Sequence, residues 1–272
     1  SAGCSGGLCQ DTYACLKLVR HDRPERIFMT SEDQLWEQNA TWWQEGFTEG
    51  QDPEYAEQIL PIVENILAGS QRVIDIGCGE GQLTRLLEGL GSQAVGLDPT
   101  WAQIREANSR NENSNLVQAG AGHLPFADCC FDAALACLVF EHIEDLETSI
   151  KEVARVLRPD GRFALLLNHP LLQTPGSGWV EDFEQDSVER YWRIGPYLME
   201  QETIEEVEKG VFIPFVHRPL SRYVNVLIEN GLFLERMIEP IPPEGFRSQN
   251  PSYEAAAHIP RLLVLVTRKI NM

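Results

Sequence analysis

A glycine-rich segment directly after an apolar run is the strongest chemical signal in this chain of 272 residues. Val73–Gly81 reads Val-Ile-Asp-Ile-Gly-Cys-Gly-Glu-Gly, and an amphipathic stretch follows it. Glycines let the backbone turn sharply and approach a ligand without a clash from a Cβ atom. The N-terminus of the helix that follows offers unpaired N–H groups to a carboxylate or phosphate. The segment therefore predicts a nucleotide-type ligand site at the carboxyl end of a strand in an α/β sheet.

The spacing of the glycines separates two classes of nucleotide site. The dinucleotide fingerprint G-x-G-x-x-G requires a third glycine at position 82, but the chain has Gln82 there and reads G-x-G-x-G. This departure disfavours a dehydrogenase that binds a pyrophosphate group. Asp98 follows the second apolar run, 21 residues beyond Gly77, and is therefore placed to accept hydrogen bonds from the hydroxyls of a ribose.

Five further motifs follow the glycine-rich segment. They are Gly96–Thr100, Leu124–Phe126, Phe131–Leu135, Glu141–Ile143 and Leu157–Arg162. In sequence and in order, the motifs of residues 73–167 resemble those of class I S-adenosylmethionine-dependent methyltransferases of the small-molecule, methyltransferase domain 11-like type. The resemblance implies a Rossmann-like fold with S-adenosylmethionine (SAM) as the cofactor. It also implies transfer of the methyl group of SAM to a small-molecule acceptor by in-line displacement.

The resemblance gives each matching residue a role. The cofactor-binding residues that it implies are Asp75, Gly77, Cys78, Gly79 and Gly81 in the loop, Asp98 and Pro99 after the second strand, Ala121, Gly122 and His123 near adenine, and Cys137 and Leu138 near the sulfonium. Residues 77–79 are expected to line the methionine part, while Asp75 organises the loop and the amine. Many family members carry an acid before the Leu-Pro-Phe turn to receive the adenine amine, where this chain has Gly120.

Methyl transfer demands mainly correct positioning from the protein. The carbon is already activated by the sulfonium, so orientation and exclusion of water are the largest contribution, up to roughly 7–11 kcal/mol in well-oriented systems. A base helps only where the acceptor must lose a proton. His142 and His169 follow the fourth and fifth expected strands and are the candidate catalytic bases, ahead of His217. A structural histidine is the alternative for each of them.

An irregular stretch, residues 169–217, interrupts the regular alternation of elements. It is too long for an ordinary connection, and we expect it to form a lid over the acceptor, with an acidic helical piece near Thr203–Lys209. The expected substrate-binding residues are Trp43 from the opposite wall, and Trp179, Tyr191, Trp192 and Tyr197 from the lid. Core packing is the alternative for these aromatic side chains. The acidic run of residues 181–186 is typical of a solvated face, with a funnel for a basic acceptor as the alternative.

Short apolar runs alternate with amphipathic segments, which is typical of βαβ units. The expected fold is an α/β, Rossmann-like three-layer sandwich with a mostly parallel seven-stranded sheet, N-terminal helices and the lid inserted after the fifth strand. The expected strands are residues 73–76, 94–97, 116–117, 131–139, 162–167, 232–238 and 262–267.

Turn signals and missing periodicity divide the rest of the chain. A turn is expected at residues 158–161, and a hairpin-like excursion at residues 239–258. Residues 1–34 show no sustained periodicity and are expected to form a mobile N-terminal arm. Residues 35–272 are expected to form a single domain.

The charge balance limits the partners. The chain has 41 acidic and 22 basic residues, a net charge of −19. This disfavours nucleic acid and anionic membranes, because binding to phosphates needs a basic surface. The sequence has no apolar run long enough for a membrane span and no secretory signal pattern, so a cytoplasmic location is expected. The seven cysteines lack the paired spacing of a zinc site, so no metal is expected.

Three alternatives to the methyltransferase interpretation stay open at this point. They are a non-catalytic SAM-binding or scaffold protein on the same fold, a nicotinamide-dependent oxidoreductase, and an aminopropyltransferase. The sequence does not identify the acceptor, the acceptor atom or the oligomeric state.

Overall fold

The computed structural model describes residues 31–184, 187–249 and 257–270. Its first element is helix α2 (Ser31–Gly46), so the expected N-terminal arm is wrong in its last four residues, 31–34. Residues 1–30 of the expected arm lie outside the described part of the chain.

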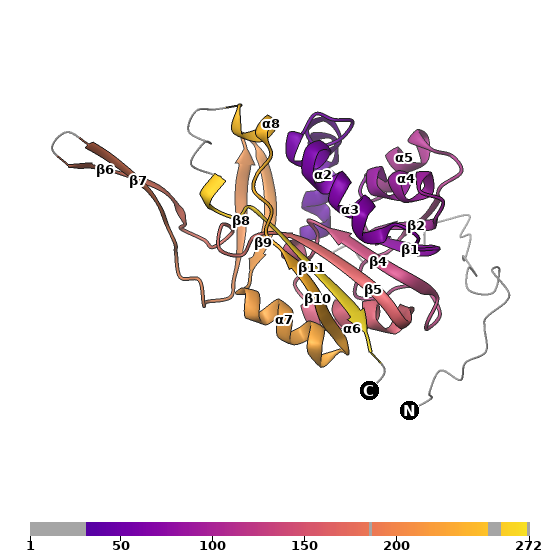
Figure 1. Ribbon diagram of the computed structural model, residues 1–272. Helices are drawn as coiled ribbons and strands as arrows, with labels where there is room; N and C mark the ends of the chain where they lie inside the picture. The colour runs from indigo at the N-terminus through magenta and orange to yellow at the C-terminus, as the bar shows by residue number, and fades with distance from the viewer. Residues whose placement is uncertain (1–30, 185–186, 250–256, 271–272) are drawn as a thin grey trace.

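A seven-stranded sheet forms the centre of the molecule, in the strand order β10-β11-β5-β4-β1-β2-β3. Its strands are β1 (Arg72–Ile76), β2 (Gln93–Asp98), β3 (Asn115–Gln118), β4 (Phe131–Cys137), β5 (Leu157–Asn168), β10 (Leu232–Ile238) and β11 (Leu262–Lys269). The pairs among β1 to β5 are parallel, while β11 runs antiparallel to both β5 and β10. The expected Rossmann-like α/β fold with a mostly parallel seven-stranded sheet is confirmed (Figure 1).

Helices cover both faces of this sheet because alternate residues of each strand point to opposite sides. Ile74 and Ile76 of β1 join one apolar cluster with α6 (Leu146–Val156) and α7 (Leu220–Glu229). Val73 joins the other cluster with α3 and α4. The helices on this second side are α3 (Leu60–Leu67) and α4 (Gln82–Gly89), while α5 (Trp101–Arg110) packs along β3 and β2.

The turn that brings α3 onto the sheet is a short π-helix, η1 (Tyr55–Ile59). It passes directly into α3, and Pro61 lies where the π-helix changes to the α-helix. Because proline has no N–H for the helical hydrogen bond, it favours such an irregularity. Tyr55 and Ile59 face the protein interior, so this segment forms a wall next to β1 and β4.

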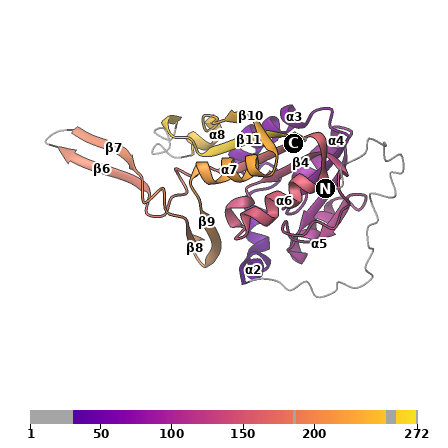
Figure 2. The same ribbon diagram turned by 90° about the horizontal axis from the view of Figure 1, so that it is seen from below.

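The irregular stretch after β5 consists of two hairpins, so the expected helical piece at Thr203–Lys209 is wrong. The first hairpin pairs β6 (Gly178–Glu184) with β7 (Ser187–Arg193), and the second pairs β8 (Gln201–Glu208) with β9 (Val211–His217). The cross-strand ladder from β9 overrides the helical propensity of the glutamates in β8. The β6–β7 hairpin projects away from the sheet in both views, whereas β8–β9 lies beside α2 (Figures 1 and 2).

Three smaller expectations also need correction. Residues 158–161, expected as a turn, fall within β5, where Asp160 has φ +62° and the pairing register with β4 shifts. Strand β4 ends at Cys137, because Leu138 adopts φ +56° and the chain then enters the 3-10 turn η2 (Phe140–His142). The described part of residues 239–258 holds a helical turn, α8 (Glu244–Arg247), in place of a hairpin, and residues 250–256 lie outside the description.

No helix in the described ranges is long and apolar enough to cross a membrane.

Candidate functional site

The glycine-rich loop joins β1 to α4 in a conformation that glycine adopts most easily. Gly77 and Gly79 have φ angles of +71° and +54°, in the left-handed region that L side chains rarely enter. A Cβ atom at Gly77 would also overlap the Val139 side chain. The N–H groups of Gly77 and Cys78 both donate to the Leu97 carbonyl, at 2.7 and 3.0 Å. These two bonds hold the loop against the end of β2.

Asp98 is the last residue of β2 and contacts the loop. Its Oδ2 accepts a hydrogen bond from the Gly79 N–H at 3.0 Å, and its Oδ1 accepts one from the Thr100 N–H at 2.8 Å. The residue is buried, yet it lines a cavity next to the loop. A carboxylate offers about four acceptor sites, so Asp98 can hold the loop and also accept hydrogen bonds from ligand hydroxyls.

Asp75 lies within the sheet below the loop and sets its electrostatics. The side chain is buried, and the Thr84 hydroxyl donates to its Oδ2 at 2.7 Å. Burial raises the pKa of Asp75 to about 7, and the negative charges of Asp98 and Glu80 raise it further. The hydrogen bonds from Thr84 lower this pKa but do not offset the effect of burial. A cation bound at the loop would lower this pKa again. The loop therefore favours a positively charged ligand.

A first cavity of about 120 Å³ opens beside the loop. Nine of the residues singled out in the sequence line it, namely Trp43, Gly77, Cys78, Gly79, Asp98, Pro99, Cys137, Leu138 and His142. The sequence analysis missed six others, Trp36, Tyr55, Thr100, Gln103, Val139 and Ile143. Tyr55 comes from the π-helix, where it hydrogen-bonds the buried Cys137 thiol, and no local pattern in the sequence points to that contact.

A second cavity, of about 330 Å³, adjoins the first. Trp36, Trp43, Leu138 and His142 line both cavities, so these residues mark the junction between them. The other lining residues are Trp42, Phe47, Asp52, Glu54, Gln58, Ile59, Asn168, Gln173, Glu205, Val207, Ile213, Phe215, Arg261 and Leu262. Its volume is at the lower end of the range of small-molecule sites, roughly 300–1,000 Å³.

His142 is the titratable side chain at the junction. Its Nδ1 lies 2.6 Å from the Pro214 carbonyl, and since a carbonyl only accepts, Nδ1 carries the proton and Nε2 has the lone pair. The ring makes edge contacts with Trp36, at 4.9 Å between centroids, and a tilted contact with Phe215 at 4.6 Å. Burial lowers the pKa of His142 to about 4. The ring is therefore neutral at physiological pH and can accept a hydrogen bond at Nε2.

Comparison with known proteins agrees with this geometry. A family model described as a methyltransferase domain matches residues 74–165. The O-methyltransferase resE of Aspergillus sclerotiorum is 36% identical over 107 residues, which are 36% of this chain and 40% of that protein. The malonyl-[acyl-carrier protein] O-methyltransferase of Pseudescherichia vulneris is 30% identical over 137 residues, covering 50% and 52% of the two chains. The chain thus spans about half the length of the curated relatives it matches.

A solved structure extends the likeness beyond the matched domain. The crystal structure of an S-adenosylmethionine-dependent methyltransferase from Mesorhizobium loti superposes with a TM-score of 0.66 at 25% identity. The superposition covers 76% of this chain and 96% of that one. Residues 74–165 thus match a methyltransferase domain, and the chain has the fold of the class I SAM-dependent methyltransferases. This likeness suggests a role for the loop and for each of the two cavities.

The residues around the first cavity suit SAM, the cofactor of this family. Gly77 packs against the Val139 side chain so closely that a side chain at position 77 would displace the loop from the cavity. Asp98 can receive ribose hydroxyls, and the buried acids below the loop favour the positive charge of the sulfonium and the amine. When bound, SAM supplies a methyl group on an activated carbon. No cluster of three or more His, Cys, Asp or Glu side chains that could hold a metal ion occurs in the described ranges.

Five residues that the resemblance assigns to the cofactor do not line the first cavity. Asp75 and Gly81 act from within the loop and the sheet, and Gly81 has φ +81° at the start of α4. Ala121 is buried in the apolar cluster beside α6, while Gly122 and His123 are exposed. Their assignment to adenine stays a prediction, and Thr100 and Gln103 are the side chains that the structure adds next to Asp98.

His169, the second candidate base, lines neither of the two cavities. Its Nε2 donates to Glu239 Oε1 at 2.9 Å, and its Nδ1 accepts the Leu171 N–H at 3.1 Å. Both ring nitrogens are occupied, so the side chain has no lone pair for an acceptor and its geometry is that of a structural histidine. His217 is also buried away from the cavities, with Nε2 2.9 Å from the Tyr197 carbonyl.

Of the expected substrate-binding aromatics, only Trp43 lines the cavities. Trp179 and Trp192 pack against each other on the β6–β7 hairpin, at 5.4 Å between ring centroids, and Tyr191 on the same hairpin is exposed. Tyr197 holds the chain before β8, because its hydroxyl accepts the Leu220 N–H at 2.9 Å. The hairpin that reaches the site is β8–β9, whose Phe215 contacts His142.

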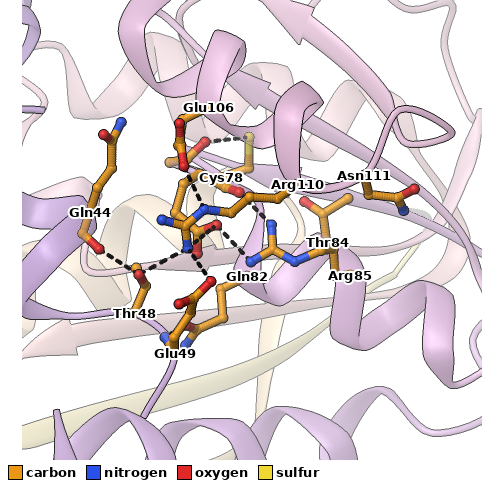
Figure 3. Close-up of polar contacts among 12 residues, drawn as sticks. Gln44, Thr48, Glu49, Cys78, Gln82, Thr84, Arg85, Glu106, Arg110 and Asn111 are labelled. Atoms are coloured by element: carbon orange, nitrogen blue, oxygen red, sulfur yellow. Dashed lines mark hydrogen bonds and ion pairs between the residues drawn. The ribbon is translucent and has the colours of Figure 1, made fainter. Parts of the chain in front are cut away.

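A buried ion network connects the cofactor loop to the end of α2. Glu80 of the loop is almost fully buried and forms ion pairs with Arg85, at 2.6 Å, and with Arg110, at 3.1 Å. Arg110 also donates to the Thr48 hydroxyl at 3.1 Å and pairs with Glu49 at 3.4 Å. Figure 3 shows Arg110 reaching both residues of the turn that follows α2. The helix that carries Trp36, Trp42 and Trp43 is therefore tied to the loop.

Proposed function

We propose that this protein transfers the methyl group of SAM to a small-molecule acceptor that binds in the second cavity. The observation that carries the proposal is the junction of the two cavities at Leu138 and His142. A ligand in the first cavity and an acceptor in the second would meet there. In-line transfer requires that the acceptor atom be held close to the methyl carbon and away from water.

The residues at the junction perform complementary tasks. Trp36 and Trp43 cover the space between the cavities and exclude water, while the neutral His142 accepts a hydrogen bond from the acceptor and orients its lone pair. The methyl–sulfur bond breaks as the bond from the acceptor to the methyl carbon forms. A hydroxyl or protonated amine must also lose a proton, and His142 Nε2 is the side-chain atom placed to take it.

The charge of the chain supports a small-molecule acceptor over a nucleic acid. With a net charge of −19, the protein would repel a phosphate backbone. A cytoplasmic location is part of the same proposal.

Isothermal titration calorimetry with SAM and with S-adenosylhomocysteine (SAH) tests the cofactor site. We expect stoichiometric binding of both ligands by the wild-type protein. In Asp98→Ala the loss of charge-assisted hydrogen bonds, each worth roughly 1.5–3 kcal/mol, should weaken SAM binding by one to two orders of magnitude. In Gly77→Ala the added side chain should abolish binding. Wild-type affinity in both variants, with native circular dichroism, would contradict the assignment of the loop.

Turnover is the second part of the test. SAM binding followed by methyl transfer to a small-molecule library supports the enzyme. SAM binding with no transfer to any acceptor would favour a non-catalytic SAM-binding protein on the same fold.

A further inference from the structure

The second cavity carries a distinctive charge. Its lining has three carboxylates, Asp52, Glu54 and Glu205, and Arg261 is the only Lys or Arg among the described residues that line it. Arg261 donates from Nε and Nη2 to the two oxygens of Glu54, at 2.9 and 3.1 Å. Its guanidinium also lies over the Phe246 ring, 4.2 Å from the centroid. The charge of Arg261 is therefore neutralised by Glu54. The carboxylates of Asp52 and Glu205 then give the cavity a net negative charge.

The position of Glu205 is unusual for a hairpin with one face toward solvent. Side chains alternate along a strand, and in this hairpin Glu205, Ile213 and Phe215 face the cavity. The neighbouring Ile204 and Phe212 point outward, with 65% and 44% of their surface exposed. A hairpin built only for packing would place the isoleucine inside and the glutamate outside. The Thr203 hydroxyl donates to Glu205 Oε1 at 3.3 Å, so the other oxygen of this inward carboxylate is the one that can face a ligand.

Aromatic rings form the other wall of the second cavity. Trp36, Trp42 and Trp43 come from α2, Phe47 follows α2, and Phe215 comes from β9. Trp43 and Phe47 stack at 4.5 Å between centroids with an interplanar angle of 14°. The faces of such rings are negative and attract cations, most strongly those of tryptophan. Aromatic rings and carboxylates in one cavity together favour a cation and disfavour an anion.

The two walls are fixed relative to each other. Trp42 Nε1 donates to Glu208 Oε2 at 2.7 Å, and Asn39 Nδ2 donates to the Phe212 carbonyl at 3.0 Å. These bonds tie β8–β9 to α2, so that Glu205 and the tryptophans enclose one space. Burial raises the pKa of Asp52, a shift that a bound cation would reverse.

We propose that the acceptor of this enzyme is an amphipathic amine. Its apolar body packs against the tryptophan wall, and its protonated amino group is recognised by Glu205 and Asp52 in the second cavity. A protonated amine has no lone pair for the methyl group, so the ammonium serves as the anchor. The methyl group goes to a different atom of the acceptor, a hydroxyl or a second amine, which lies toward His142. This inference rests on the proposed function and adds the chemical class of the acceptor.

Three matched indole compounds test the recognition. Tryptamine, tryptophol and indole-3-propionate share an aromatic body and carry a cation, a neutral hydroxyl and an anion. Calorimetry should be performed on the full-length protein, alone and saturated with SAH. We expect tryptamine to bind at least about tenfold more tightly than indole-3-propionate, equivalent to 1.4 kcal/mol, with tryptophol between them.

Glu205→Gln should reduce the preference for tryptamine severalfold and leave SAH affinity unchanged. The matched control is Glu202→Gln, which makes the same charge change on the same strand at an exposed residue that does not line the cavity. An equal effect of the two substitutions would mean that only the overall charge matters, and would overturn the inference.

The outcomes separate the inference from the proposed function. If SAH binds but the three compounds bind equally, bind in the opposite order or do not bind, the amine inference is wrong and the cofactor site stands. If SAH does not bind, the proposed function fails. Selective tryptamine binding that Glu205→Gln removes would then still show a cation site, measured on the protein alone.

Discussion

At the scale of single residues, His142 combines three properties that an acceptor-orienting group needs. It lies at the junction of the cavities, its Nδ1–H is donated to the Pro214 carbonyl, and burial keeps its pKa near 4. The low pKa makes it a weak base in water. In a dry cavity, however, a fixed lone pair that orients a hydroxyl or amine also lowers the barrier by positioning.

Replacement of His142 by Phe should lower kcat by roughly 10²-fold, the lower end of the range for a positioned acid or base. The aromatic ring keeps the contacts with Trp36 and Phe215, so SAM affinity should change little. Steady-state kinetics with calorimetry of SAM separates the two effects. His258→Phe, at an exposed position that lines neither cavity, is the control and should leave both parameters unchanged. A full kcat in His142→Phe would remove His142 from the mechanism.

Asp75 gives the cofactor site a pH dependence. Because its pKa is raised to about 7, the free protein holds a proton there below pH 7. The positive charge of SAM favours the carboxylate, so binding below pH 7 must release that proton. SAM affinity should therefore increase as the pH rises toward 7 and level off above it.

Calorimetry in buffers of different ionisation enthalpy counts the released protons and checks this expectation. Asp75→Asn should lose both the proton release and the rise of affinity between pH 5 and pH 7. The same pH profile in wild type and Asp75→Asn would assign the effect to another group.

At the scale of elements, the long insertion has two parts with different tasks. The β8–β9 hairpin is hydrogen-bonded to α2 through Trp42 and Asn39 and supplies Glu205 and Phe215 to the second cavity. The β6–β7 hairpin is built around Trp179 and Trp192, whose indoles contact each other, and Arg190 lies over the Trp179 ring at 5.4 Å. It lines neither the first nor the second cavity.

Replacement of residues 178–193 by a short Gly-Ser linker should leave SAM affinity unchanged. The hairpin pairs with itself in a two-stranded sheet of its own, so the melting temperature should shift by only a few degrees. Differential scanning calorimetry and SAM titration check both expectations. Loss of acceptor turnover with normal SAM binding would place this hairpin in the acceptor site after all, as the lid prediction for Trp179, Tyr191 and Trp192 requires.

At the scale of the whole molecule, the net charge of −19 produces a field that attracts cations. SAM carries one positive charge more than SAH, so its binding gains more from this field. Added salt screens such interactions, with a Debye length of about 10 Å at 0.1 M and about 3 Å at 1 M. SAM affinity should therefore fall with salt more steeply than SAH affinity.

Titration of both ligands at low and high sodium chloride concentrations measures this difference. The ratio of the Kd of SAM to the Kd of SAH should rise with salt. A ratio that is independent of salt would show that buried local contacts, such as those of Asp75 and Asp98, outweigh the field of the whole molecule.

The sequence by itself determined the sheet and the cofactor loop. The spacing of apolar residues within 73–167 indicates each strand and helix from neighbouring residues alone. The positive φ angles of Gly77 and Gly79 are likewise required by the turn in which they lie, so a short segment of sequence is sufficient to predict the loop. The spacing of residues identified Asp98 at the cavity, and the family resemblance implied Cys137 and Leu138.

Only the tertiary structure decided the rest of the site, because the deciding contacts join residues far apart in the chain. Residues 203–209 have helical composition, yet pairing with β9 makes most of them a strand. His142 and His169 each follow an expected strand, so the sequence does not distinguish them. The structure does, because His169 Nε2 is hydrogen-bonded to the carboxylate of Glu239, 70 residues away in the chain. The aromatic wall needs α2 and β9 together, and Glu205 faces it only because the hairpin register sets which side points inward. Acceptor chemistry therefore depends on packing between segments that no local pattern connects.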